Sequence, residues 1–235
     1  VSNYLSYETG QPTHCYDASK LGDKLSLNFI EDDCSFETLL DKTITLSDKN
    51  LVFQNSNNDT INLAGVVGGK STACNKNTTS VIIECAYFSP EIIVGKTVKY
   101  GIKSDAAHKF ERGADPVCHE KVLRRFVKII EEHAIIKDVS LYKKNTNEFK
   151  NVSLPLDVEK VNSIIGINIS NNFDDILFDL GFRIEKNSII VPSHRSDIHS
   201  INDIAEEIAR SIGYDNIPRN EVSLPVANSS INNLE

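Results

Sequence analysis

The sequence predicts an α+β protein, in which a mixed-sheet domain is followed by a small winged-helix-like domain. Residues 1–148 alternate short runs of β-branched and aromatic residues with clusters of Asp, Asn and Gly, which is typical of strands joined by turns. Residues 149–220 have apolar positions at helical spacing in segments that end at glycine, which is typical of short helices. The polar residues 143–151 lack apolar periodicity and are expected to form a linker, and a second linker is expected at 221–235.

The first domain is expected to contain short strands and one long helix. Strands are expected at 25–30, 43–46, 51–54, 61–67 and 81–88, with a polar turn at 55–60. A strand is also expected at the start of the chain, around Tyr4. The helix is expected at 115–136, with Asp115 as N-cap residue and Pro116 at the first helical position.

The second domain is expected to contain three helices and a hairpin. The expected order is a strand at 152–156, helices at 157–165 and 172–180, a hairpin of 182–185 with 188–191, and a last helix at 201–212. Gly166 and Gly181 follow the first two helices, where a left-handed residue commonly ends a helix. This order of elements predicts the winged-helix-like fold.

Composition excludes several classes of protein. The chain has 235 residues, is 40% hydrophobic and carries a net charge of -8, so it can bury a core and is no general polyanion binder. It has no apolar run of about 18 residues and no signal-peptide pattern, so we expect a cytoplasmic protein without a membrane span. Its five cysteines lack a CxxC pair and are expected to be reduced and mostly buried, without a zinc site. Since the chain begins at Val1, we expect it to be a piece of a longer one.

Two motifs in the first domain each allow a structural and a functional interpretation. The stretch 63–69 (LAGVVGG) has three glycines after a strand, which indicates either a tight turn or a close approach of backbone to a ligand; its spacing does not match a phosphate loop. Glu84 lies in an apolar strand, where burying a carboxylate without a partner is costly. It is either an outward-facing or lysine-paired residue, or an acceptor that takes a donor from a ligand.

A basic segment follows these motifs. Residues 101–116 are expected to form a loop that gathers small residues, a hydroxyl group and a histidine. Residues 96–128 contain nine Lys or Arg against four Asp or Glu, although the whole chain is acidic. This excess indicates either a phosphate-facing stripe or an ordinary charged helix face.

Four carboxylates gather around the start of the last helix. Ser200 and Asp203 have the spacing of a capping box. Asp203, Glu206 and Glu207 are expected to share the face opposite the apolar stripe, with Asp197 one turn upstream. They are either acids favoured by the helix dipole or ligands of a divalent cation such as Mg²⁺, which prefers carboxylate oxygens.

Taken together, five motifs resemble the bacterial phenylalanine–tRNA ligase beta subunit. Four lie in the order of its B3/B4 editing domain, and the fifth resembles its B5 domain. They are GQPTHCYD at 10–17, AGVVGG at 64–69, ECAYF at 84–88, FERGADP at 110–116, and the stretch from RSDI at 195–198 to EEIARSIGYDNIP at 206–218. The resemblance implies that amino-terminal tRNA-binding-type domains and a carboxy-terminal catalytic-like core lie outside this chain.

The resemblance also implies a division of labour between subunits. The alpha subunit attaches phenylalanine to tRNA(Phe) with ATP and Mg²⁺ in a heterotetramer of two alpha and two beta subunits. The beta subunit hydrolyses tyrosine that has been attached to that tRNA by mistake. The implied catalytic residues are His14, Glu84 and Ser104, the implied substrate-binding residues are Gly68 and Ala106, and the implied ligands of a Mg²⁺ shared with the alpha subunit are Asp197, Asp203, Glu206 and Glu207.

Three positions depart from the pattern of the family. They are Thr13, Ser104, where the family usually has Thr, and Ala107, where it often has Ser. Ser104 retains the hydroxyl group. The expected chemistry is ester hydrolysis by a positioned water, with Glu84 accepting the phenol hydrogen bond of tyrosine. The alternative is a catalytically silent scaffold that docks the alpha subunit and tRNA.

Overall fold

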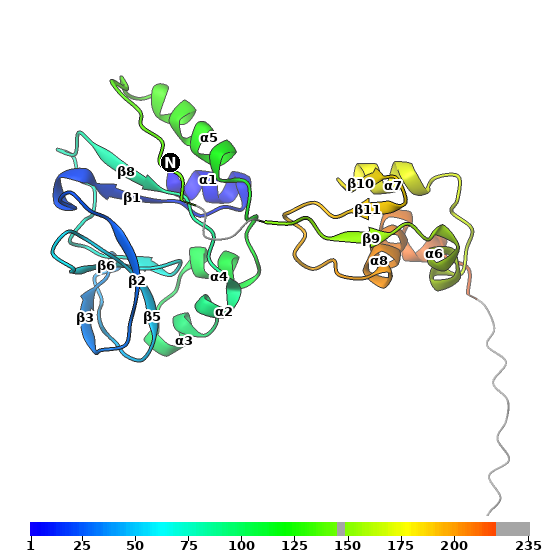
Figure 1. Cartoon of the computed structure of the whole chain (residues 1–235), viewed down its shortest axis with the longest axis horizontal. Coiled ribbons are helices and arrows are strands. Elements are labelled where there is room, and N and C mark those ends of the chain that lie inside the picture. Colours follow the sequence, from blue (N-terminus) through cyan, green and yellow to red (C-terminus); the bar gives the residue numbers. More distant parts are fainter. Residues whose placement is uncertain (145–148, 220–235) are drawn as a thin grey trace, which may run out of the picture. The chain divides into compact units, whose positions relative to one another are not determined.

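The computed structural model describes residues 1–144 and 149–219 (Figure 1). Two compact units divide them: the first takes Val1–Asn151 and Ser193–Ser196, and the second takes Val152–Pro192 and continues from Asp197. Each unit has its own cluster of buried apolar side chains. The linker expected at 221–235 lies outside the described residues.

The first unit confirms the α+β class. Its helices are α1 (Ser2–Thr9), α2 (Pro90–Ile93), α3 (Lys96–Tyr100), α4 (Asp105–Glu111) and α5 (His119–Glu131), with a 3-10 turn at Ala18–Lys20. Its strands are β1 (His14–Asp17), β2 (Ser26–Ile30), β3 (Cys34–Glu37), β4 (Thr43–Leu46), β5 (Asn50–Gln54), β6 (Thr60–Leu63), β7 (Val67–Gly68) and β8 (Val81–Glu84). They form a four-stranded sheet in the order β2-β5-β6-β7 and two pairs, β1-β8 and β3-β4. The strand pairs of the described residues are antiparallel, where a mixed sheet had been expected.

The glycine-rich stretch interrupts one of the expected strands. The apolar run 61–67 divides into β6 and β7, because the backbone reverses at Gly65, whose φ is +71°. That angle lies in the left-handed region, which glycine enters without a side-chain clash. The strand expected at 81–88 is also shorter than predicted. It ends at Glu84, and the residues from 85 to 88 are not part of a strand.

Three expectations about helices are corrected. The long helix begins at His119 and not at Asp115, because Asp115 accepts a hydrogen bond from Val117 N in a turn of its own. The segment 101–116, which is expected to form a loop, contains the helix α4 (Asp105–Glu111). The start of the chain forms α1 and not a strand; this helix buries Leu5 and ends at Gly10, whose φ is +76°.

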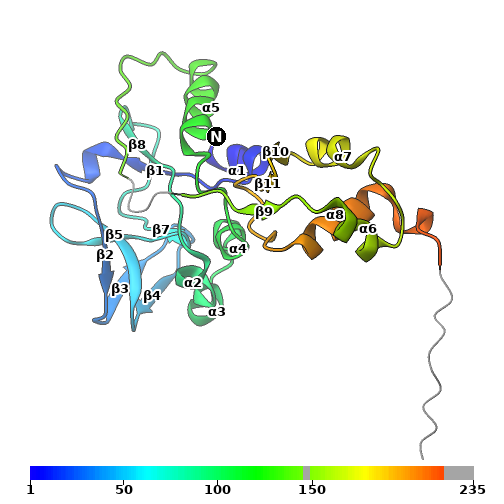
Figure 2. The same ribbon diagram turned by 45° about the vertical axis from the view of Figure 1, so that its right-hand side comes forward.

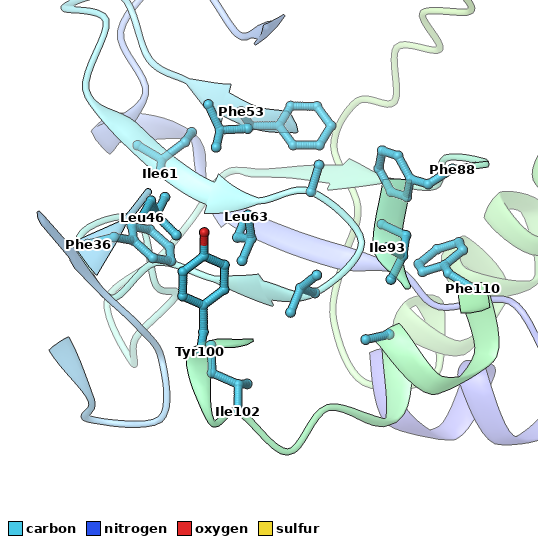
Figure 3. Close-up of a cluster of buried hydrophobic side chains, with 14 of the residues drawn as sticks. Phe36, Leu46, Phe53, Ile61, Leu63, Phe88, Ile93, Tyr100, Ile102 and Phe110 are labelled. Atoms are coloured by element: carbon cyan, nitrogen blue, oxygen red, sulfur yellow. The ribbon is translucent and has the colours of Figure 1, made fainter. Parts of the chain in front are cut away.

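The core of the first unit joins its sheets to its short helices. The aromatic rings of Phe53, Phe88 and Phe110 are in edge contact, with centroids 6.3 Å and 5.1 Å apart along the series. Figure 3 shows Ile93 of α2 beside Phe110 of α4, and Tyr100 reaching from α3 toward the strands. The helices α2, α3 and α4 lie together in both ribbon views (Figures 1 and 2). This packing fixes α4 against the glycine turn.

The second unit closely follows the sequence prediction. It consists of β9 (Ser153–Pro155), α6 (Val158–Ile165), α7 (Phe173–Asp179), β10 (Arg183–Glu185), β11 (Ser188–Ile190) and α8 (Ile201–Ile212), with a 3-10 turn at Tyr214–Asn216. The strands form an antiparallel sheet in the order β10-β11-β9. Gly166 and Gly181 have φ of +86° and +85°, which confirms the predicted ends of α6 and α7.

Candidate functional site

The β1–β8 pair brings two of the predicted catalytic residues together. His14 of β1 lies directly opposite Glu84 of β8 in the antiparallel register. Directly opposed residues point to the same side of a sheet, and so do residues two apart along a strand. His14, Tyr16 and Glu84 therefore share one face. The rings of His14 and Tyr16 are in edge contact, with centroids 4.5 Å apart.

The carboxylate of Glu84 is held by two neutral polar side chains. Tyr16 Oη donates a hydrogen bond to Glu84 Oε2 over 2.6 Å. Asn62 of β6 donates to the same oxygen over 3.4 Å and to Tyr16 Oη over 2.7 Å. Neither structural alternative expected for Glu84 is found, because the residue does not face solvent freely and its hydrogen-bond partners in the described residues are not lysines.

Burial sets the charge of this pair. Burial raises the pKa of Glu84 to about 7, although the hydrogen bond from Tyr16 acts in the opposite direction. Burial lowers the pKa of His14 to about 4, so its imidazole is neutral at pH 7. At neutral pH the site therefore combines an uncharged imidazole with a carboxylate near its point of half-ionisation.

Gly68 is small because His14 occupies the space beside it. A Cβ atom on Gly68 would lie 2.2 Å from Cε1 of His14 and 2.9 Å from Cδ1 of Leu39. Gly68 also lies opposite Asn62 in the β6–β7 register, so β7 brings the glycine turn to the same site. The stretch 63–69 thus makes a turn at Gly65, and at Gly68 it closely approaches the side chain of His14. Its approach to a ligand stays a prediction.

Ser104 links α4 to the glycine turn. It is the N-cap residue of α4, where its Oγ accepts a hydrogen bond from Ala107 N over 3.1 Å and donates one to Val66 O over 2.5 Å. Ala106, in the first turn of α4, is partly buried against the core. These bonds place Ser104 next to the turn, and both of them end on the backbone and not on Glu84.

Tyr16 and Asn62 are the site residues that the sequence did not single out. Tyr16 is fully buried and Asn62 is 4% exposed. The signal for Tyr16 was its position two residues after His14, which places it on the same face of any strand. No comparable signal identifies Asn62, because its contact with Glu84 depends on how separate strands meet.

Part of the basic segment forms ion pairs within the first unit. Lys99 pairs with Asp48, Arg124 with Glu120, Arg125 with Glu8 and Lys128 with Glu131. These pairs account for four of the nine basic residues between 96 and 128. The contacts favour the interpretation as a charged surface stabilised by acids nearby over a continuous phosphate-facing stripe.

The four carboxylates of the second unit are arranged differently from the expected shared face. Asp203 forms the predicted capping box with Ser200, and its Oδ2 accepts hydrogen bonds from Ser200 and His199, which keep its pKa below the ordinary value. Glu207 is only 6% exposed and pairs with Arg210, whereas Glu206 is exposed. Within residues 1–144 and 149–219, no group of three or more His, Cys, Asp or Glu side chains is placed to hold a metal ion.

Two further expectations concern the cysteines and the membrane. All five cysteines are free thiols; four of them are partly buried, and the expected burial is wrong at Cys74, which is exposed. Among the described helices, none has the length and apolar character needed to cross a bilayer.

Comparisons with known proteins cover both units. The B3/4 domain family matches residues 1–135, and the tRNA synthetase B5 domain family matches residues 154–214. The phenylalanine–tRNA ligase beta subunit of Protochlamydia amoebophila is 36% identical over 230 residues, which are 94% of this chain and 28% of that protein. The subunit of the same name from Neisseria meningitidis serogroup B is 33% identical over 225 residues, with 93% and 28% covered. The chain spans 28% of the length of these relatives.

Proposed function

Because the chain belongs to the B3/4 domain family and continues into a tRNA synthetase B5 domain, we propose that it is part of a phenylalanine–tRNA ligase beta subunit. In the complete enzyme, the alpha subunit attaches phenylalanine to tRNA(Phe) with ATP. The first unit of this chain hydrolyses tyrosine from mischarged tRNA(Phe). The observation that carries this proposal is the meeting of His14, Gly68 and Glu84 at one site formed by β1, β7 and β8.

A second site is needed because the two amino acids differ by one hydroxyl group. A hydrophobic pocket shaped for phenylalanine rejects an added hydroxyl by only about a hundredfold. A partly buried carboxylate such as Glu84 accepts a hydrogen bond from the phenol of tyrosine. Phenylalanine offers no donor, so its binding leaves the charged oxygen desolvated and unpaired, which costs about 1–3 kcal/mol or more. Selectivity for tyrosine over phenylalanine then arises because phenylalanine leaves the Glu84 carboxylate without a hydrogen-bond donor.

The hydrolysis itself transfers the aminoacyl group to water. The water oxygen bonds to the ester carbonyl carbon, the bond to the terminal ribose oxygen breaks, and that oxygen takes up a proton. Neutral His14 has a ring nitrogen able to accept a hydrogen bond from this water. Backbone N–H groups near Gly68 are candidates to orient the carbonyl, and the ribose hydroxyl of the substrate is a candidate to assist. Ser104 holds the turn through Val66. The small side chain of Ala106 is proposed to leave room for the aminoacyl group.

The second unit is proposed to contact the alpha subunit. Asp197, Asp203, Glu206 and Glu207 do not form a Mg²⁺ site by themselves, because Asp203 caps α8 and Glu207 pairs with Arg210. A bound Mg²⁺ would therefore take ligands from both subunits. It would stabilise their contact by neutralising carboxylates that otherwise repel one another. The heterotetramer of two alpha and two beta subunits, its tRNA(Phe) partner and its cytoplasmic location belong to the same proposal.

The alternative is that the first unit is a silent scaffold. A silent scaffold has no need for a glycine packed against an imidazole or for a carboxylate held by hydrogen bonds. The geometry around Gly68 and Glu84 therefore favours the hydrolase.

Deacylation of Tyr-tRNA(Phe) and Phe-tRNA(Phe) by the complete enzyme tests the proposal. The parent should release tyrosine much faster than phenylalanine, and Glu84→Gln should narrow this ratio at least tenfold. Glu37→Gln, which changes an exposed strand residue paired with Lys70, is the matched control and should leave the ratio unchanged. A parent enzyme that releases neither amino acid would support the scaffold instead.

A further inference from the structure

Three side chains form a closed set of hydrogen bonds around one oxygen of Glu84. Asn62 Nδ2 carries two hydrogens, one directed to Tyr16 Oη and one to Glu84 Oε2. Tyr16 has a single hydroxyl hydrogen, which it donates to the same Oε2. The donor and acceptor roles are therefore fixed, and Oε2 receives both bonds that these residues donate to the carboxylate.

The donor already present is the same chemical group as the one to be recognised. Tyr16 supplies a phenol hydroxyl, and the proposed substrate differs from the correct one by a phenol hydroxyl. In the part of the chain that the structure describes, the hydrogen bonds to Glu84 all end at Oε2. A ligand that binds while this arrangement persists meets Oε1.

We propose that Tyr16, supported by Asn62, is a specificity-determining residue that holds Glu84 Oε2 and leaves Oε1 to read the phenol of the mischarged tyrosine. This inference rests on the proposed function and adds to it the residues that orient the acceptor. Tyr16 and Asn62 act through Glu84, so they are positioning residues.

The surroundings of Tyr16 suit this role. Its side chain is fully buried, and its ring contacts His14 at 4.5 Å and lies 6.3 Å from the ring of Phe53, as measured between centroids. Asn62 is also buried, in a strand at the centre of the four-stranded sheet. Burial of both donors limits rotation of the carboxylate, so Oε1 keeps one direction.

The bond from Tyr16 also keeps the acceptor ionised. Burial raises the pKa of Glu84, and the Tyr16 bond lowers it. The titratable groups around the carboxylate are Tyr16, His14 and Cys15 from β1, and Cys85 next to it in the chain. Loss of the bond raises the pKa of Glu84, so the carboxyl group stays protonated at pH values where that of the parent is ionised. A protonated carboxyl group no longer discriminates against phenylalanine by its charge.

Tyr16→Phe in the complete enzyme tests the proposal, because it removes one hydroxyl and keeps the ring. The measured quantity is the ratio of kcat/KM for Tyr-tRNA(Phe) over Phe-tRNA(Phe) between pH 5.5 and 9. The ratio should fall about tenfold at pH 7, and the pH at which it reaches half its maximum should rise by about one unit. Tyr100→Phe is the matched control, since it removes another buried hydroxyl that binds Ser47 O and Asn50 in the same core.

A second variant and a direct titration complete the test. Asn62→Ser, which keeps a polar side chain, should move the pH midpoint in the same direction by less. The ¹³C signal of the Glu84 carboxyl should titrate at higher pH in Tyr16→Phe than in the parent. This readout does not depend on activity, so an inactive parent would refute the proposed function while the titration still tests the hydrogen bond. An unchanged midpoint and titration, or a ratio that rises because Tyr16 competes with the substrate, would overturn the inference.

Discussion

The phenol oxygen of Tyr16 and Oε2 of Glu84 are 2.6 Å apart, within the range of charge-assisted O–H···O⁻ hydrogen bonds. Their separation in the chain is 68 positions, and the antiparallel pairing of β1 with β8 closes it. One oxygen of the carboxylate, Oε2, is thus paired inside the protein before any ligand binds. The property to test is therefore the ionisation state of Glu84 as a function of pH.

Glu84→Gln should make the stability of the protein less sensitive to pH between about 4.5 and 7. The pKa of Glu84 is raised to about 7 in the folded state, above its ordinary value in the unfolded chain. The resulting stabilisation is fully present below about pH 4.5 and is lost as the pH rises through about 7. The free energy of unfolding of the variant relative to the parent should therefore increase over this interval, by at most about 3 kcal/mol.

Denaturant unfolding at a series of pH values measures this difference. Glu37→Gln serves as the control for a strand glutamate at an exposed position. A variant-minus-parent difference that stays flat between pH 4.5 and 8 would contradict the raised pKa of Glu84.

Gly68→Ala should displace the imidazole of His14. The added methyl group has no room, since Cε1 of His14 lies 2.2 Å from its position. Overpacking of this kind typically costs about 1–3 kcal/mol. Deacylation of Tyr-tRNA(Phe) should fall together with thermal stability.

The double variant Gly68→Ala with His14→Ala separates the clash from other effects. Removing the imidazole should recover part of the stability lost in Gly68→Ala, which a double-mutant cycle detects as a coupling energy. Strictly additive losses would mean that the two side chains do not meet.

Ser104→Ala should loosen the link between α4 and the glycine turn. It removes an N-cap and the hydrogen bond to Val66 O, and loss of an N-cap costs about 1 kcal/mol. Ser104→Thr keeps both hydrogen bonds and should retain parental stability and deacylation. Ser200→Ala removes the cap of α8 in the other unit, so it should lower stability without changing deacylation. Equal deacylation by Ser104→Ala and the parent would remove Ser104 from the site.

In the proposed heterotetramer, Glu206→Gln should weaken the response to Mg²⁺. Glu206 is exposed on α8, so its loss should leave the stability of the isolated chain within about 0.5 kcal/mol. In the complete enzyme, the thermal stabilisation that Mg²⁺ provides should decrease. Glu159→Gln on α6 is an exposed helical control. If both variants respond to Mg²⁺ as the parent does, the ion is bound elsewhere.

The sequence by itself predicted the second unit closely. Strong local signals mark its elements: Asp157 and Ser200 cap α6 and α8, and glycines end α6 and α7. Such signals act within a few residues, so they operate before tertiary contacts form. In the first unit the same approach missed α1 and α4, whose short lengths give little periodicity and whose burial comes from packing on other elements.

The sequence also singled out the residues proposed to carry chemistry, and the tertiary structure decided what each one touches. His14, Gly68 and Glu84 stand out by type and motif, but Gly68 makes room for His14 and Glu84 is bonded to Tyr16 and Asn62. The physical reason is that strand pairing brings distant residues together: β8 follows β1 by more than 60 residues, and register alone fixes which side chains face one another. Local patterns report which face a residue takes, whereas hydrogen-bond partners across strands depend on the folded sheet.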